Sequence, residues 1–281
     1  MIVVTGATGN VGRPLVEALA AVGEQVTAVS RRPTGAELPE GVRHHRADLA
    51  DPGSLRPVLD GADALFLLFA GELLAGTAQT GALLDVARSA GVRRVVLLSS
   101  QAAGTRPDAV SHAAMRAFED TVRPSGLDWT ILRPGGFASN AFAWTESVRK
   151  ERMIAAPFAD VGLPVVDPED IAEVAAATLR GRGHAGRTYE LTGPAPVSPR
   201  QQAQTIGDAL GEPVRFTELS RERARAEMLR FMPEPVADGT LDILGEPTAA
   251  EQRVSPDVER VLGRPPRAFA DWAMRNIAAF R

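Results

Sequence analysis

The chain predicts an α/β protein of the Rossmann-like class, in which helices cover both faces of a doubly wound parallel sheet. Strand-like and helix-like segments alternate through the first half of the chain, which is the order that a parallel sheet requires. The first strand pattern, at residues 2–5, runs directly into glycines at positions 6, 9 and 12 and then into a helical pattern. A later segment, residues 62–70, is a continuous apolar run, which is typical of a strand buried on both faces.

The three glycines predict a nucleotide-binding turn. In a strand-turn-helix unit, Gly6 permits the sharp turn, Gly9 lets a pyrophosphate approach the backbone, and Gly12 lets the helix pack closely on the strand. The phosphates then lie at the helix N-terminus, where unpaired N–H groups and the helix dipole favour anions. A turn packed for its own sake is the alternative. The other residues of this turn that we assign to the predicted cofactor site are Thr8, Asn10 and Val11.

The remaining elements follow in order along the chain. Further strands are expected at residues 26–30, 42–46, 62–70, 95–99 and 129–132, with a helix over about 77–90. Beyond about residue 150 the alternation weakens. A helix beginning at Pro168, a strand over 189–192, a helical piece at about 221–231 and an amphipathic terminal helix over 267–280 are expected there.

Composition excludes several classes of function. A net charge of −4 gives no electrostatic argument for a nucleic-acid or membrane-surface partner. The absence of cysteine excludes disulfides, thiolate catalysis and cysteine-ligated metals. His44 and His45 are neighbours in an expected strand and point to opposite faces, so we expect no metal site. No apolar stretch reaches the ~18 residues of a membrane helix, and we expect a cytoplasmic protein without a signal peptide.

The end of the second strand favours NADP(H) over NAD(H), although NAD(H) remains possible. An acidic residue about 20 positions after the glycines binds the ribose 2′-hydroxyl of NAD in such sheets. Here Arg31 and Arg32 follow Ser30, and guanidinium groups can pair with a 2′-phosphate. The alternative is a solvated basic turn. We expect further cofactor contacts near the adenine and along the cofactor cleft from Asp48, Leu49, Leu67, Leu68 and Phe69.

A series of motifs spread over nearly the whole chain matches one known family. The motifs are TGATGNVG at 5–12, ADL at 47–49, SS at 99–100, GLDWTILRPGGF at 126–137, Asn140, DPEDIA at 167–172, YELTGP at 189–194 and the terminal helix. In these the chain resembles the atypical short-chain dehydrogenase/reductases, in particular the NmrA-like and triphenylmethane-reductase-like branch. The resemblance implies a Rossmann core over about 1–155, and over about 156–281 mixed core elements with a small C-terminal substrate-binding lobe. The family includes NAD(P)H-dependent reductases of quinones and aromatic dyes, as well as members that only sense the nucleotide.

The usual catalytic pair of short-chain dehydrogenases is missing. That pair is a tyrosine acid and a lysine four positions apart on one helix. The only tyrosine is Tyr189 and the only lysine is Lys150, so this pair cannot form. The family pattern places Met115 and Glu119 at the two positions. Met115 is expected to be core or an apolar pocket wall, and Glu119 either contacts the nicotinamide ribose or is a solvated or helix-pairing carboxylate.

Other candidates for the reaction site lie around the expected carboxyl edge of the sheet. Ser99 and Ser100 end the fifth strand, where they either hydrogen-bond the nicotinamide or a substrate carbonyl or simply cap a turn. His112 is either an acid or a surface or helix-start histidine. Candidate pocket residues, each with ordinary packing as the alternative, are Phe137, Asn140, Phe142 and Trp144 after the sixth strand, and Phe231 and Met232 in a predicted lid segment.

These observations predict an NAD(P)H-dependent oxidoreductase that transfers hydride to a quinone-like or polycyclic aromatic small molecule. Such an acceptor delocalises the charge that it receives, so it needs little help from a protein acid, and positioning carries most of the catalysis. One alternative is a non-catalytic NAD(P) redox sensor. Another is an NAD(P)H-supported oxygenation enzyme that tailors an aromatic natural product, such as a polyketide. The sequence leaves the oligomeric state open.

Overall fold

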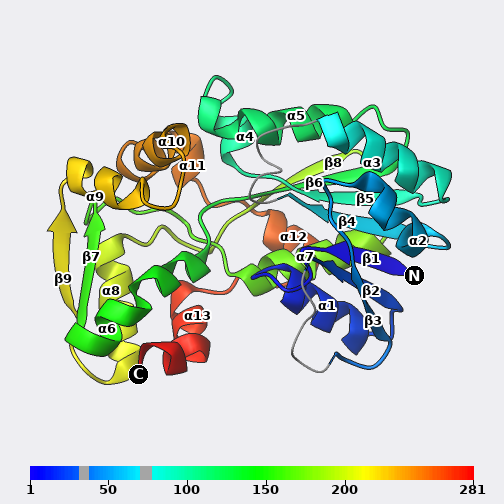
Figure 1. Ribbon diagram of the computed structural model, residues 1–281. Coiled ribbons are helices and arrows are strands. Elements are labelled where there is room, and N and C mark those ends of the chain that lie inside the picture. The colour runs from blue at the N-terminus through cyan, green and yellow to red at the C-terminus, as the bar shows by residue number, and fades with distance from the viewer. Residues whose placement is uncertain (32–37, 70–77) are drawn as a thin grey trace. The chain divides into compact units, whose positions relative to one another are not determined.

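A seven-stranded sheet forms the centre of the first part of the chain (Figure 1). The computed structural model describes residues 1–31, 38–69 and 78–281. The strands are β1 (Ile2–Thr5), β2 (Val26–Ser30), β3 (Val42–Arg46), β4 (Ala64–Leu68), β5 (Arg94–Leu98), β6 (Asp128–Pro134) and β8 (Arg187–Leu191), in the order β3-β2-β1-β4-β5-β6-β8. The pairs β1–β2, β1–β4, β2–β3, β4–β5 and β5–β6 are parallel. The reversal of order beside β1 is the point at which such sheets bind ligands.

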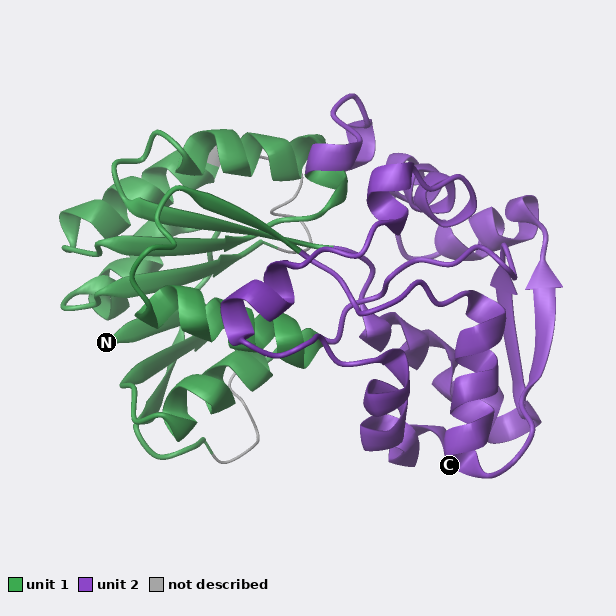
Figure 2. Cartoon of the chain, turned by 180° about the vertical axis from the view of Figure 1, so that it is seen from behind, with its two compact units in different colours: residues 1–103, 113–134, 168–190 green, residues 104–112, 135–167, 191–281 purple. Residues whose placement is uncertain are grey.

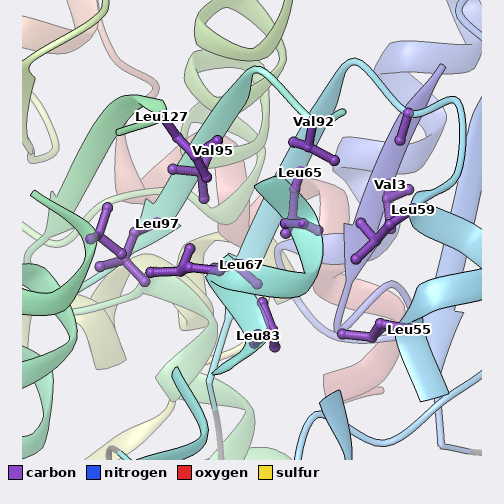
Figure 3. Packing of buried hydrophobic residues seen from close by; sticks show 14 of the residues in the cluster. Val3, Leu55, Leu59, Leu65, Leu67, Leu83, Val92, Val95, Leu97 and Leu127 are labelled. Atoms are coloured by element: carbon purple, nitrogen blue, oxygen red, sulfur yellow. The ribbon is translucent and has the colours of Figure 1, made fainter. Parts of the chain in front are cut away.

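Helices cover both faces of this sheet, as the Rossmann-like class predicts (Figure 1). One face carries α1 (Gly12–Ala21) and α7 (Pro168–Arg180), which pack against each other. The other face carries α2 (Arg56–Leu59), α3 (Ala78–Ser89) and α5 (Ala113–Val122). Figure 3 shows the core on this second face, where strand and helix side chains interdigitate; labelled members are Val3, Leu55, Leu59, Leu65, Leu67, Leu83, Val95 and Leu97.

The chain divides into two compact units that alternate along the sequence (Figure 2). Unit 1 contains residues 1–103, 113–134 and 168–190, and unit 2 contains residues 104–112, 135–167 and 191–281. Core elements therefore return after residue 155, in α7 and β8, while residues 104–112 and 135–155 belong to unit 2.

Unit 2 is built around a small parallel pair of strands, β7 (Met153–Pro157) and β9 (Arg215–Leu219). Its helices include α4 in part (Ala102–Thr105), η3 (Val110–His112), η4 (Ala138–Trp144), α6 (Thr145–Glu151), α8 (Pro199–Leu210), α9 (Arg221–Met228), α10 (Glu234–Gly245), α11 (Ala249–Gln252), α12 (Asp257–Leu262), α13 (Phe269–Asn276) and η5 (Ile277–Phe280). Apolar residues of α8, α13 and η5 form its main core, with Trp272 and Phe280 both buried.

The expected strands of the main sheet and the expected helices are confirmed, with shifts of a few residues at their ends. The terminal amphipathic pattern divides into α13 and a 3₁₀ turn, η5. Strands β7 and β9 were not predicted. No helix in the described part of the chain is long and apolar enough to cross a membrane.

Candidate nucleotide-binding and active site

The turn between β1 and α1 has the geometry that a pyrophosphate needs. Gly6 has a φ of +64°, which favours glycine, and the Gly9 N–H donates to the Gly6 carbonyl oxygen at 3.0 Å. A Cβ atom on Gly12 would lie 2.1 Å from the same oxygen, so only glycine allows α1 to begin this close to β1. A Cβ on Gly9 would lie 3.3 Å from the Gly6 carbonyl oxygen and would meet no further heavy atom within 4 Å, which leaves the outer side of the turn open. Thr8 and Asn10 are exposed beside it, so these residues fit a dinucleotide phosphate.

The Thr5 side chain connects strands β1 and β4 by hydrogen bonds beside this turn. The Thr5 hydroxyl donates to the Phe66 carbonyl oxygen at 2.9 Å and accepts from the Leu68 N–H at 3.0 Å. This extends the β1–β4 pairing to the carboxyl edge of the sheet. Leu68 is partly exposed and consequently lies beside Gly6. A Cβ atom added to Gly6 would be 3.2 Å from the Leu68 Cδ2 atom.

The neighbours of Leu68 do not lie as the sequence predicted. Leu67 is fully buried in the core cluster, because alternation along β4 turns it to the opposite face of the sheet from Leu68. The expectation that Leu67 lines the cofactor cleft is therefore corrected. Phe69 is 6% exposed and stacks on Phe118, with ring centroids 4.2 Å apart. Of these three predicted cleft residues, Leu68 alone offers substantial surface to a ligand.

In the part of the chain that the structure describes, the carboxyl ends of β2 and β3 carry basic groups, and no acidic residue directly follows β2. Arg31 is exposed directly after Ser30, while Arg32 lies outside the described residues. Arg46, also exposed, is the register partner of Ser30, so a second guanidinium lies on the neighbouring strand end. The Ser30 hydroxyl is 2.8 Å from His44 Nε2. This arrangement fits a 2′-phosphate better than a 2′-hydroxyl.

The predicted adenine residues follow β3. Asp48 is exposed, and its Oδ1 accepts from the Ala50 N–H at 3.0 Å, which fixes the carboxylate in a local turn. Leu49 is partly buried and packs against the core cluster.

A buried carboxylate joins the ends of β5 and β6 to α5. Glu119 has only 1% of its side chain exposed. Arg133 donates to both of its oxygens, from Nε at 2.9 Å and from Nη2 at 2.6 Å, and Arg123 Nη2 donates at 2.9 Å. Ser99 Oγ donates to Glu119 Oε1 at 2.6 Å. Glu119 thus pairs with Arg123 one turn further on, as the helix-pairing alternative expected, but it is buried and also pairs with Arg133 on β6, so it is not a solvated carboxylate.

The arginines decide the charge of this cluster. Burial by itself raises the pKa of Glu119, but the hydrogen bonds from Arg133 and Ser99 and the nearby guanidinium charges outweigh it and hold the pKa below its ordinary value. The Glu119 hydrogen bond raises the pKa of Arg133. Arg123 also lies over the Trp129 ring at 5.7 Å. Glu119 is consequently an ionised acceptor and has no proton to give to a substrate.

The other candidates for acid chemistry lie in different surroundings. Ser100 is partly exposed, and its Oγ accepts from the Ala102 N–H at 3.3 Å. Met115 is partly buried against the core cluster, so the core interpretation describes it better than an open pocket wall. His112 ends η3 just before α5, with Nδ1 3.0 Å from the Ser111 hydroxyl, which is the helix-start position that the sequence left open.

The single tyrosine and the single lysine serve structural contacts. The Tyr189 hydroxyl lies 2.8 Å from His184 Nδ1, in the loop that leads into β8 and thus at the amino end of that strand. Lys150 pairs with Glu146 one turn away in α6. Neither provides the acid or the ribose contact of the usual pair.

The candidate substrate residues all belong to unit 2. Phe142 is 37% exposed and packs edge-to-face on Trp272, with ring centroids 4.9 Å apart. Trp144 is partly buried against the same core. Phe231 is 74% exposed between α9 and α10, and Met232 beside it is partly buried. The two remaining candidates, exposed Asn140 and partly buried Phe137, flank the start of η4.

Fold and turn together define a Rossmann-type dinucleotide-binding protein. A model of a family described as NAD(P)H-binding matches residues 6–181. A (4-alkanoyl-5-oxo-2,5-dihydrofuran-3-yl)methyl phosphate reductase of Streptomyces griseus is 37% identical, over 100% of this chain and 99% of that protein. An NAD(P)H azoreductase of Xenophilus azovorans is 32% identical, over 100% of this chain and 99% of that protein. The NADPH complex of quinone oxidoreductase QOR2 from Escherichia coli superimposes with a TM-score of 0.82 at 25% identity, covering 98% and 99% of the two chains.

The chain belongs to the NAD(P)H-binding family and is an NAD(P)H-dependent oxidoreductase. The resemblance to the atypical short-chain dehydrogenase/reductases is confirmed. When bound, the nucleotide supplies hydride, and the β1–α1 turn and the neighbouring strand ends are the residues of this chain that fit it.

Three contributors to the site were missed by the sequence reasoning. Arg133 and Arg123 pair with Glu119, and Thr5 connects the turn to β4 by hydrogen bonds. Arg133 carried a usable signal, because a charged residue at the end of the apolar strand 129–132 demands a buried partner.

Proposed function

We propose that this chain is an NADPH-dependent reductase of small, conjugated, electron-poor molecules of the quinone type. The observation that carries the proposal is the Glu119 cluster. At the two positions of the usual acid pair stand a methionine and an ionised carboxylate that two arginines hold. A substrate of this site must therefore stabilise the charge that hydride transfer leaves on it. Quinones and related conjugated acceptors do so by delocalisation, and solvent water can then supply the proton.

The relatives support the same chemistry. Their names cover a quinone, an azo compound and an unsaturated oxo-furan phosphate. These acceptors differ in shape but share conjugation with electron-withdrawing groups. The exposed aromatic side chains of unit 2, Phe142 and Phe231, suit flat acceptors of this kind.

The proposal is tested by following NADPH oxidation at 340 nm with a quinone, an azo dye, an α,β-unsaturated lactone and an aliphatic ketone. We expect turnover of at least one conjugated acceptor, none of the ketone, and no stoichiometric oxygen uptake once redox cycling of the reduced product is excluded. Efficient ketone reduction would overturn the proposal. Coupled oxygen consumption would instead favour the oxygenation alternative, and tight NADPH binding without any turnover would favour a sensor.

Arg31 is expected to carry much of the preference for NADPH. Replacing it with alanine removes a charge-assisted hydrogen bond to the 2′-phosphate, so the Kd for NADPH rises about tenfold while the Kd for NADH stays unchanged. Nucleotide fluorescence titration measures both constants. Arg43→Ala is the matched control, because this exposed arginine lies on β3 away from its carboxyl end. An equal loss for both nucleotides would show that Arg31 does not read the 2′-phosphate.

A further inference from the structure

Two adjacent serines at the carboxyl end of β5 have opposite hydrogen-bonding polarity. Ser99 Oγ lies 2.6 Å from an oxygen of Glu119, which can only accept when ionised. The single hydroxyl hydrogen of Ser99 is consequently committed to Glu119, and its lone pairs are what it offers to any other group. Ser100 Oγ accepts from the Ala102 N–H at 3.3 Å, so its own hydrogen can be donated.

The surroundings of Glu119 make the polarity of Ser99 permanent. Arg133 binds both carboxylate oxygens, and Arg123 adds a further hydrogen bond to Oε2. Two guanidinium groups thus contact one buried carboxylate, and protonation of Glu119 would remove the buried negative charge that both of them face, although Arg123 also pairs with Asp120 at 3.3 Å. Ser99 itself is 8% exposed at the carboxyl edge of the sheet, which is where a nucleotide lies in this fold.

We propose that Glu119 is a positioning residue that fixes Ser99 as a hydrogen-bond acceptor for the carboxamide N–H of the nicotinamide. Ser99 then orients the nucleotide and does not supply the proton of the reaction. The inference rests on the nucleotide site and deepens the proposed function, because it assigns a role to the carboxylate that replaces the usual lysine.

A double-mutant cycle on NADPH binding tests this role without any substrate. Glu119→Gln keeps the size of the side chain, but its amide can donate to Ser99 and so reverse the hydrogen bond. We expect Glu119→Gln and Ser99→Ala each to raise the Kd for NADPH about three- to tenfold. In the double variant the Kd should rise no further than in Ser99→Ala alone, because Glu119 acts through Ser99.

Two matched variants serve as controls. The first is Ser100→Ala, which removes the neighbouring hydroxyl. In a protein that already carries Ser100→Ala, Glu119→Gln should raise the Kd for NADPH by the same factor as in the natural protein. Arg88→Gln changes an exposed arginine on α3 that pairs with Asp85, outside the site, and should leave the Kd unchanged. If Glu119→Gln lowers the Tm without changing the Kd, or if its effect adds in full to that of Ser99→Ala, Glu119 is only structural and the proposal is wrong.

A second measurement needs no change at Glu119 and therefore holds even if that variant does not fold. The 3-acetylpyridine analogue of NADPH carries a methyl group where the carboxamide has its N–H donor. Ser99→Ala should weaken binding of NADPH three- to tenfold and leave binding of the analogue unchanged. An equal loss for both nucleotides would overturn the assignment. Because only binding is measured, failure here is distinguishable from failure to find a quinone-type substrate.

Discussion

Replacing Gly12 with alanine is expected to destabilise unit 1 by about 3 kcal/mol, the upper end of the usual cost of overpacking. The added Cβ would lie 2.1 Å from the Gly6 carbonyl oxygen and 2.8 Å from the Ala7 Cα atom. Both are backbone atoms within the turn, so no side chain can move aside to make room. The turn itself must open, and the Kd for NADPH should rise at least tenfold, or about 1.4 kcal/mol.

Urea unfolding and NADPH titration measure the two effects of Gly12→Ala. Gly23→Ala is the matched control, since Gly23 has a φ of +79° but a Cβ there would meet nothing within 4 Å. It should cost only the backbone strain of about 1–2 kcal/mol and leave the Kd unchanged. If Gly12→Ala bound NADPH as tightly as the natural protein, the close approach of α1 to β1 would not be what shapes the phosphate site.

The nucleotide half of the site was predictable because its chemistry is local. Gly6, Gly9 and Gly12 act through the backbone of one turn, and their spacing in the sequence is their spacing in the structure. The same holds for Arg31, which needs only to follow the second strand. Apolar runs likewise predicted the central strands β1, β4 and β5, because burial on both faces leaves a plain signal.

The remaining features depend on partners that are distant in sequence. The position of Glu119 on α5 said nothing of Arg133, 14 residues later on β6, and so could not reveal that this carboxylate is buried in an ion pair. Leu67 and Leu68 read alike in an apolar run, and only the register of β4 tells which faces the core. Strand β7 pairs with β9 some 60 residues away, and both are short, with β9 mostly exposed. Their stability comes from that pairing, which local propensity does not reveal.

Removing Arg106 is expected to have the largest effect on unit 2. It should lower the free energy of unfolding by about 3–5 kcal/mol, because the buried carboxylate of Glu251 loses its counter-ion. Arg106 donates from Nε and Nη2 to the two oxygens of Glu251, at 2.8 and 2.9 Å, and Glu251 has 2% of its side chain exposed. Further hydrogen bonds run from Arg106 to the carbonyl oxygens of Asp242 and Glu246. These contacts join residues 104–112, the segment that leads into α5, to helices α10 and α11.

Urea unfolding of Arg106→Met at pH 7 measures this cost. The double variant Arg106→Met/Glu251→Met should recover most of the loss, because no uncompensated charge remains. Arg88→Met is the surface control. Its partner is Asp85, both side chains are well exposed, and the change should cost less than about 0.5 kcal/mol. Equal stabilities of the single and double variants would mean that the loss of Arg106 does not leave an uncompensated charge on Glu251.

The pH dependence of the stability of Arg106→Met distinguishes an uncompensated buried charge on Glu251 from lost packing of the arginine side chain. Burial by itself raises the pKa of Glu251, but the hydrogen bonds from Arg106, the Thr248 N–H and Thr105, together with the Arg106 charge, outweigh it and hold the pKa below its ordinary 4.5. A lowered folded pKa gives stability that is complete above pH 4.5 and is lost as the pH falls toward the folded value. Without Arg106, only the Thr105 and Thr248 hydrogen bonds oppose burial, so the pKa of Glu251 rises and the variant loses less stability on acidification than the natural protein. The deficit of Arg106→Met relative to the natural protein should therefore shrink between pH 7 and pH 4. A deficit that stays constant would assign the cost to packing of the arginine side chain, and the buried charge of Glu251 would then contribute little.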